Sequence, residues 1–152
     1  MTFDTNRTRR HIMLASTGLA ASVLVHPALA TGDELASTVT TYAGGQKVTP
    51  GKVKLEVAEL VDNGNVVPIT VSVDSPMTAA NHVKAIAVFN EKNPQREVIK
   101  FMLGPRYGKA SVSTRIRLAT TQKLVAVAQM SDGTYWSHTV EVIVTLAACI
   151  ES

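Results

Sequence analysis

Residues 122–146 read QKLVAVAQMSDGTYWSHTVEVIVTL, and this pattern is typical of a β-hairpin. Asp132-Gly133 suits the turn, because glycine tolerates a positive φ angle and aspartate is the next most tolerant neighbour. Residues 124–130 supply the β-compatible run before the turn. After the turn, alternate residues share one largely apolar face: Trp136, His138, Val140, Val142, Val144 and Leu146. A period of two predicts a long terminal strand with one face buried.

Similar strands precede this hairpin. Segments 53–57 and 67–73 alternate apolar with polar residues, and Pro68 indicates an edge or the beginning of a strand. Further β-compatible runs cover residues 83–89, 97–103 and 112–118. The turn residues between runs are Asp62-Asn63-Gly64-Asn65, Ser75-Pro76, Asn93-Pro94 and Gly104-Pro105. About seven short strands in roughly 100 residues predict an all-β fold, an immunoglobulin-like antiparallel β-sandwich, with a small barrel as the nearest alternative.

A short N-terminal helix is predicted over residues 33–43. Leu35, Val39 and Tyr42 recur at the spacing of one helical face. The acidic pair at its start suits the positive end of the helix dipole, and Gly44-Gly45 suits its termination.

The first 30 residues have the organisation of an export signal. Three arginines (Arg7, Arg9 and Arg10) precede an apolar run from Ile12 to Val25, and Ala28-Leu29-Ala30 forms a small-x-small cleavage site. The run is too short and too rich in small residues for a membrane anchor. Residues 8–14 resemble the twin-arginine pattern, and an ordinary secretory signal is the alternative. Either route predicts a periplasmic protein.

Cutting after Ala30 leaves residues 31–152, a length that suits one domain with its own hydrophobic core. Removing the three signal arginines and Asp4 lowers the formal net charge from +3 to +1. Because no basic patch survives, nucleic-acid binding is not expected. No later segment could span a membrane, so no membrane insertion is expected after signal cleavage.

Side chains that could support catalysis or metal binding are scarce. The mature chain offers His82, His138 and Cys149, with no two at the spacing of metal ligands, so neither a metal nor a cofactor is expected. His138 lies on an apolar strand face and is predicted to be a hydrogen-bonded structural histidine. Pairing of Cys149 with either imidazole would make a thiol enzyme, but a chain terminus is a poor place for a preorganised nucleophile. We therefore do not expect the chain to be an enzyme.

Cys149 is the one cysteine of the chain and stands close to its C-terminus. Exported proteins normally use cysteines in pairs, so an odd one indicates intermolecular pairing or a free reactive thiol. A cysteine in a frayed terminus without any role is the plainer alternative. We divide the mature chain into a β-sandwich domain, residues 31–146, and a tail, residues 147–152, on which a thiol could be covalently modified and presented to partners.

Several long motifs resemble the SoxY family, the sulfur-carrier subunits of the periplasmic SoxYZ thiosulfate-oxidation complex. They begin with Asp62-Asn63-Gly64-Asn65-Val66-Val67-Pro68 and Val71-Ser72-Val73-Asp74-Ser75-Pro76-Met77. They continue with Asn93-Pro94, with residues 113–119, with Gln122, and with residues 125–133. The resemblance covers nearly the whole mature chain, and a twin-arginine signal also suits this family.

The resemblance implies an immunoglobulin-like sandwich that forms a heterodimer with a SoxZ-like subunit. It also implies that Cys149 is the carrier cysteine, holding intermediates as an S-thiosulfonate or a persulfide. SoxAX-like haem proteins would load thiosulfate, a SoxB-like hydrolase would remove sulfate, and a SoxCD-like dehydrogenase would oxidise the remaining sulfane sulfur.

The tail departs from the family pattern. The family ends in Gly-Gly-Cys-Gly-Gly, whereas this chain ends in Ala147-Ala148-Cys149-Ile150-Glu151-Ser152. Alanine and isoleucine restrict and widen a segment that glycine would leave free and slim. The alternative function is therefore a divergent SoxY-like binding or regulatory paralogue, in which Cys149 forms an intermolecular disulfide.

Overall fold

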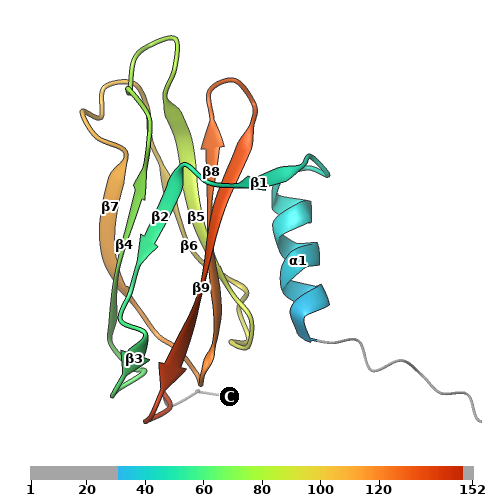
Figure 1. Cartoon of the computed structure of the whole chain (residues 1–152), viewed down its shortest axis with the longest axis vertical. Helices are drawn as coiled ribbons and strands as arrows, with labels where there is room; N and C mark the ends of the chain where they lie inside the picture. Colours follow the sequence, from blue (N-terminus) through green and yellow to red (C-terminus); the bar gives the residue numbers. More distant parts are fainter. Residues whose placement is uncertain (1–30, 149–152) are drawn as a thin grey trace, which may run out of the picture.

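Two β-sheets pack face to face in the computed structural model, which describes residues 31–148 (Figure 1). The predicted export signal, residues 1–30, and residues 149–152 lie outside this range. The larger sheet has the order β1 (Val48–Pro50), β9 (Tyr135–Val144), β8 (Gln122–Met130), β5 (Val83–Asn90) and β6 (Glu97–Met102), with β3 (Leu60–Val61) also paired to β9. The smaller sheet has the order β2 (Val53–Glu56), β4 (Val67–Val73) and β7 (Ser111–Ile116).

This arrangement confirms the predicted immunoglobulin-like sandwich. All seven predicted strands are present, and Gly133 adopts a φ of 86° in the turn between β8 and β9. The strands β1 and β3 were not predicted, because segments of three and two residues are too short to show a period. Both run parallel to β9, whereas the other pairings are antiparallel.

The main core lies between the sheets and follows the alternation in the sequence. In β4, Val67, Ile69 and Val71 are buried while the intervening residues are not. Pro68 is the second residue of β4, where the strand pairs with β7 but has not yet reached β2. Its missing N–H therefore interrupts no ladder on the β2 side, which fits the expected strand beginning.

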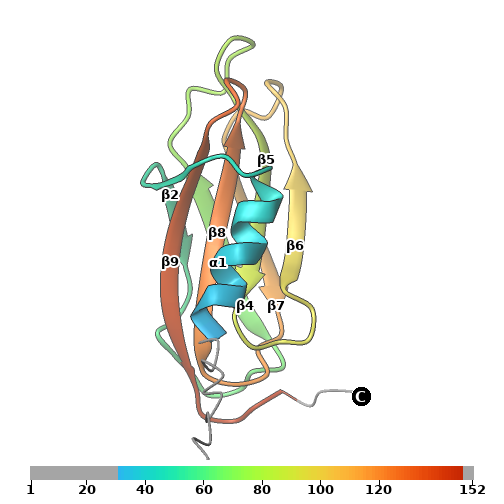
Figure 2. The same cartoon turned by 90° about the vertical axis from the view of Figure 1, so that its right-hand side faces the viewer.

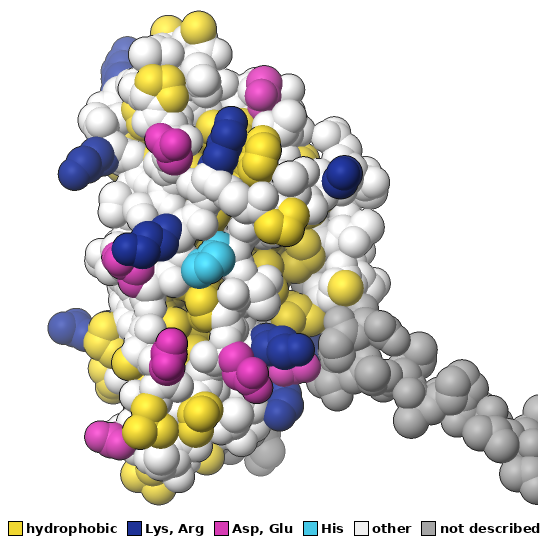
Figure 3. All heavy atoms as spheres, viewed as in Figure 1, with side chains coloured by type: hydrophobic (Ala, Val, Ile, Leu, Met, Phe, Trp, Pro, Cys, Tyr) yellow, Lys and Arg dark blue, Asp and Glu magenta, His cyan; other side chains and the backbone are white. Residues whose placement is uncertain are grey.

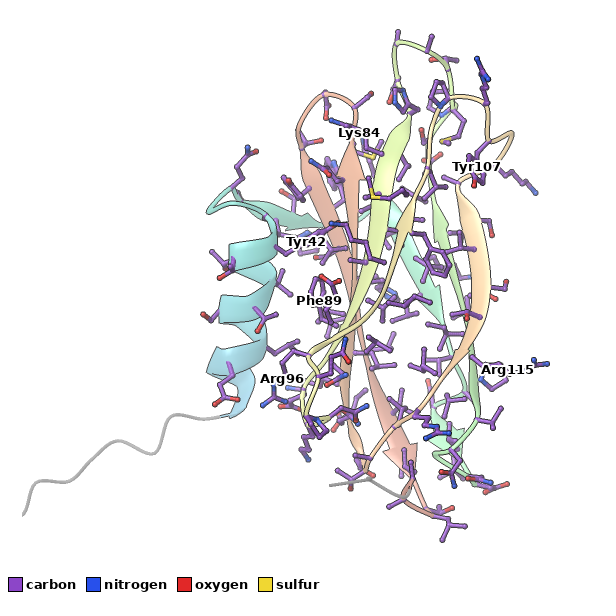
Figure 4. All side chains as sticks on the ribbon, turned by 180° about the vertical axis from the view of Figure 1, so that it is seen from behind. Tyr42, Lys84, Phe89, Arg96, Tyr107 and Arg115 are labelled. Atoms are coloured by element: carbon purple, nitrogen blue, oxygen red, sulfur yellow. The ribbon has the colours of Figure 1, made fainter. Side chains whose placement is uncertain are left out.

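The helix α1 (Thr31–Tyr42) covers the outer face of the larger sheet (Figures 1 and 2). Its buried residues, together with Ala43 just after its end, pack with residues of β5, β8 and β9 in a second apolar cluster: Leu35, Val39, Ala43, Ala87, Phe89, Val125, Val127 and Tyr135. Tyr42 meets Phe89 edge to face with ring centroids 5.2 Å apart, and Figure 4 shows the two rings between helix and sheet. Because both faces of β5 and β8 are covered, these strands are apolar almost throughout.

The terminal strand β9 follows its predicted face except at the end. Val142 is buried and Trp136, Val140 and Val144 pack partly against the core. Leu146, however, is 61% exposed. The prediction was wrong for Leu146 because β9 ends at Val144 and the chain then follows a different course.

Candidate functional site

The candidate site is the end of the sandwich where the chain leaves β9. Cys149 itself lies outside the described residues, which end at Ala148. What the structure describes is the segment that leads to it, residues 145–148, which we call the tail root. The tail root crosses the end of the sandwich, away from β9 (Figure 2).

Main-chain hydrogen bonds hold the tail root on the domain. The Thr145 N–H donates to the Val61 carbonyl at 3.0 Å, and the Ala148 N–H donates to the Leu118 carbonyl at 3.3 Å. Ala148 is 7% exposed. The domain therefore holds the chain as far as Ala148, two residues into the segment 147–152 that was expected to form the tail.

Gly64 is the centre of this attachment. Its N–H donates to the Leu146 carbonyl at 2.9 Å, and its carbonyl accepts the Leu118 N–H at 2.8 Å. A Cβ atom at this position would lie 2.3 Å from the Leu118 oxygen, 3.0 Å from the Ala148 nitrogen and 3.1 Å from a methyl group of Val144. Only glycine lets three segments approach so closely without displacing one of them.

The sequence pattern predicted a turn at Asp62-Asn63-Gly64-Asn65 but not this contact. The chain does turn here, because the Asn63 side-chain oxygen accepts the Asn65 N–H at 2.9 Å. The further use of Gly64 depends on residues 54 and 84 positions away along the chain, at Leu118 and Ala148. A sequence signal did exist, since Gly64 lies within a SoxY-like motif, but the motif does not state its partner.

A buried polar network supports the segment that carries Leu118. The Asn93 side-chain oxygen accepts the Ala119 N–H at 3.0 Å and the Gln122 amide at 2.7 Å, while the Asn93 amide donates to the Arg117 carbonyl at 2.8 Å. Gln122, 1% exposed, also accepts the Lys92 N–H at 2.9 Å. These bonds fix the connection between β7 and β8. They therefore also fix the position of the Leu118 carbonyl, which accepts the Ala148 N–H.

Asn90 extends the network into the turn between β5 and β6. It is fully buried, accepts the Asn93 N–H at 3.0 Å and donates to the Gln95 carbonyl at 2.8 Å. The SoxY-like residues Asn93 and Gln122 therefore have a structural role. They hold the segment around Leu118, which, together with Gly64, contacts the tail root.

The two histidines of the described residues, His82 and His138, do not meet the tail root. His138 accepts the Leu55 N–H on Nδ1 at 3.0 Å, which confirms the predicted hydrogen-bonded structural histidine. It lies six residues before Val144 along β9, roughly 20 Å away at strand spacing. His82 contacts Thr78 and Ser131, beside the turn at the opposite end of β9.

Two side chains have shifted pKa values, and both lie away from the tail root. Hydrogen bonds from the hydroxyl and N–H of Thr134 hold the pKa of Asp132 below its ordinary value. Burial, with smaller effects of Tyr135 and Glu97, raises the pKa of Tyr42 to about 12. Within residues 31–148, no three His, Cys, Asp or Glu side chains gather as a metal-binding group, and no helix is long and apolar enough to cross a membrane.

Comparisons with solved structures show the fold and a similarity to one sulfur carrier protein. The sulfur carrier protein SoxY from Chlorobium limicola f thiosulfatophilum matches with a TM-score of 0.64 and 28% identity, over 76% of this chain and 99% of that chain. A superoxide reductase (neelaredoxin) from Ignicoccus hospitalis matches with a TM-score of 0.55 and 22% identity, over 62% of this chain and 80% of that chain. A superoxide reductase from Nanoarchaeum equitans matches with a TM-score of 0.54 and 13% identity, over 63% of this chain and 100% of that chain. The two reductases share the fold alone.

Comparison at the level of sequence families is more specific. No curated protein matches the chain. The family model described as sulfur oxidation protein SoxY matches residues 39–149, a range that contains the Gly64 contact, the Asn93–Gln122 network and the tail root. The chain therefore belongs to the SoxY family of sulfur oxidation proteins.

Proposed function

We propose that this protein is a periplasmic covalent carrier of sulfur intermediates, which it holds on the Cys149 thiol and presents to partner enzymes. One observation carries the proposal: the single cysteine of the chain directly follows Ala148, the residue that the Gly64 and Leu118 contacts hold at the end of the sandwich. The carrier role requires that this thiol be reachable by another protein, and the described chain leads to it at the end of the sandwich.

The carrier needs no active site of its own in this scheme. The Cys149 thiolate and the outer sulfur of thiosulfate form a disulfide bond, and the two electrons released pass to a SoxAX-like haem partner. Water then cleaves the bond between sulfane sulfur and sulfonate in a SoxB-like hydrolase, releasing sulfate and leaving a cysteine persulfide. A SoxCD-like dehydrogenase would oxidise the remaining sulfane sulfur.

Two further parts of the proposal rest on family membership and on the sequence. The chain forms a heterodimer with a SoxZ-like subunit, an association that membership of the SoxY family implies. Residues 1–30 direct export to the periplasm as a twin-arginine signal, which would carry the folded pair across the membrane together.

The alanines before Cys149 give the carrier a shorter free arm than the glycines of the family pattern. The main-chain bonds described for this segment hold the chain up to Ala148, the residue before Cys149. We expect partner enzymes to approach the end of the sandwich closely instead of receiving a long arm.

The test is mass spectrometry of the purified heterodimer after incubation with thiosulfate and the SoxAX-like partner. The expected result is the added mass of a thiosulfonate on Cys149, absent from Cys149→Ser and lost on treatment with reductant. No adduct with an active loading enzyme would refute the proposal. A disulfide-linked dimer as the main periplasmic species, lost in Cys149→Ser, would instead support the regulatory paralogue.

A further inference from the structure

The strand β9 is open along part of one edge. On the side away from β8, β1 pairs with Tyr135–Ser137 and β3 pairs with Ile143–Val144. Between these short pairings, residues 138–142 have no strand neighbour on this side within the described part of the chain. Open edges of this kind are templates for pairing with another strand.

Main-chain groups of β9 point out of the open edge. The Ser137 carbonyl accepts the Gly51 N–H, and the Ile143 N–H donates to the Glu59 carbonyl, so odd-numbered residues face this side. By the period of two, the N–H and C=O groups of Thr139 and Glu141 face it as well. They offer hydrogen bonds to an added segment about two to three residues long.

A groove of about 590 Å³ lies along this edge. Its apolar lining comes from Leu55 and Val57 at β2 and from Val140 and Ile143 of β9. The apolar surface continues toward the tail root, because Ile143 pairs with Leu60 and both are more than half exposed, as is Leu146. Exposed apolar residues gathered in this way mark an interaction surface.

Acidic side chains accompany the apolar ones. Glu59 and Glu141 line the groove, and Figure 3 shows hydrophobic and acidic side chains side by side on this face. A second copy of this chain, paired edge to edge, would add its own Glu59 and Glu141 to the same interface, and this concentration of like charge is unfavourable. A different protein with lysine or arginine at matching positions would meet complementary charge.

We propose that this open edge of β9, with the groove and the exposed Leu60, Ile143 and Leu146, is the docking surface for the second small β subunit of the SoxZ-like kind. An edge segment of that subunit hydrogen-bonds to Thr139 and Glu141, places apolar side chains in the groove and sets basic side chains against the glutamates. The inference rests on the proposed function. It seats the subunit two residues from Ala148, so the subunit borders the approach to the Cys149 thiol.

The test compares matched substitutions on the two edges of the larger sheet. Glu141→Lys and Ile143→Ser alter the proposed surface. Glu97→Lys makes the same charge reversal, and Met102→Ser likewise replaces an apolar side chain with serine, at exposed positions of β6, the opposite edge strand. The dissociation constant of the SoxZ-like subunit from the same bacterium is measured by titration calorimetry at two salt concentrations, with unfolding temperature as a folding control.

We expect each β9 variant to weaken binding by roughly tenfold or more, with both β6 variants close to wild type. Glu141→Lys should also reduce the salt dependence of binding. Equal affinities for all four variants, stronger effects on β6, or a wild-type homodimer dissolved by Glu141→Lys would overturn the assignment. Loading of thiosulfate onto Cys149 is scored separately, so a failed carrier function with intact β9-dependent binding is distinguishable from a failed docking surface.

Discussion

Replacing Gly64 by alanine probes the attachment of the tail root directly. The added Cβ would start 2.3 Å from the Leu118 carbonyl oxygen, against 3.4 Å for ordinary contact, and the atoms around it are mostly main chain. The segments must therefore separate. Separation weakens the two bonds of Gly64, to Leu146 and from Leu118, and the bond from Ala148 to Leu118.

The expected loss of stability follows from these contacts. Overpacking a filled site costs about 1–3 kcal/mol, and each weakened main-chain hydrogen bond adds up to about 1 kcal/mol. We expect a total of about 2–4 kcal/mol, which corresponds to a fall in Tm of roughly 8–16 °C for a domain of this size. If the tail root alone detaches, the fall in Tm is smaller, but the Ala148 and Leu118 amides lose protection from hydrogen exchange.

The assay is thermal unfolding of reduced residues 31–152, combined with amide exchange by NMR and the rate of Cys149 alkylation. Gly108→Ala is the matched control, since a Cβ at Gly108 meets no atom within 4 Å. Gly64→Ala should alkylate faster than wild type and Gly108→Ala should not. A Tm within about 2 °C of wild type together with unchanged exchange at Ala148 would refute the role assigned to Gly64.

Three other predictions concern single side chains. Gln122→Met leaves the Lys92 N–H without its acceptor and removes one of the two donors to the Asn93 oxygen, so it should cost about 1–3 kcal/mol in urea unfolding; a loss under about 0.5 kcal/mol would contradict the network. The pKa of Asp132 is lower in the folded protein than its ordinary value, so the stabilisation by its carboxylate is present above the ordinary pKa and is lost as pH falls through the folded pKa. The difference in Tm between wild type and Asp132→Asn should therefore shrink in acid. A difference that stays constant with pH would contradict this role of the carboxylate. The folded pKa of Tyr42 is about 12, so an absorbance titration should show one late tyrosine ionisation that Tyr42→Phe abolishes. The contribution of the neutral Tyr42 side chain to folding stability is complete below the ordinary tyrosine pKa and is lost as pH rises through about 12.

Local patterns predicted most of the secondary structure. The alternation in segment 67–73 survives unchanged as β4, because the pleat of a strand sends successive side chains to opposite faces wherever the strand is placed. The helix predicted over 33–43 is present as α1, and its end coincides with Gly44 and Gly45 in positive-φ conformations. The predictions failed where length or context decides, at the very short β1 and β3 and at the exposed Leu146.

The candidate site was predictable only in part. The SoxY-like motifs predicted the family, which the comparisons confirm. The carrier role of Cys149 stays a prediction, and no pattern indicated that Gly64 contacts the tail root. Nor did any pattern indicate that Asn93 bonds to Gln122 and accepts the N–H of Ala119, in the connection between β7 and β8. The type of a polar residue does not predict whether its side chain will be exposed to solvent or buried against a partner far away in the sequence.

The sequence by itself determined the hairpin around Asp132-Gly133, the period-two strands, the terminal position of the thiol and membership of the SoxY family, since each depends on residues close together in the chain or on their order. Tertiary structure alone decided that Gly64, Leu118 and Ala148 meet at one end of the sandwich and that the edge of β9 stays open between β1 and β3. These features arise from packing between segments up to 84 residues apart. Their close approach depends on the geometry of both sheets together, which no local pattern contains.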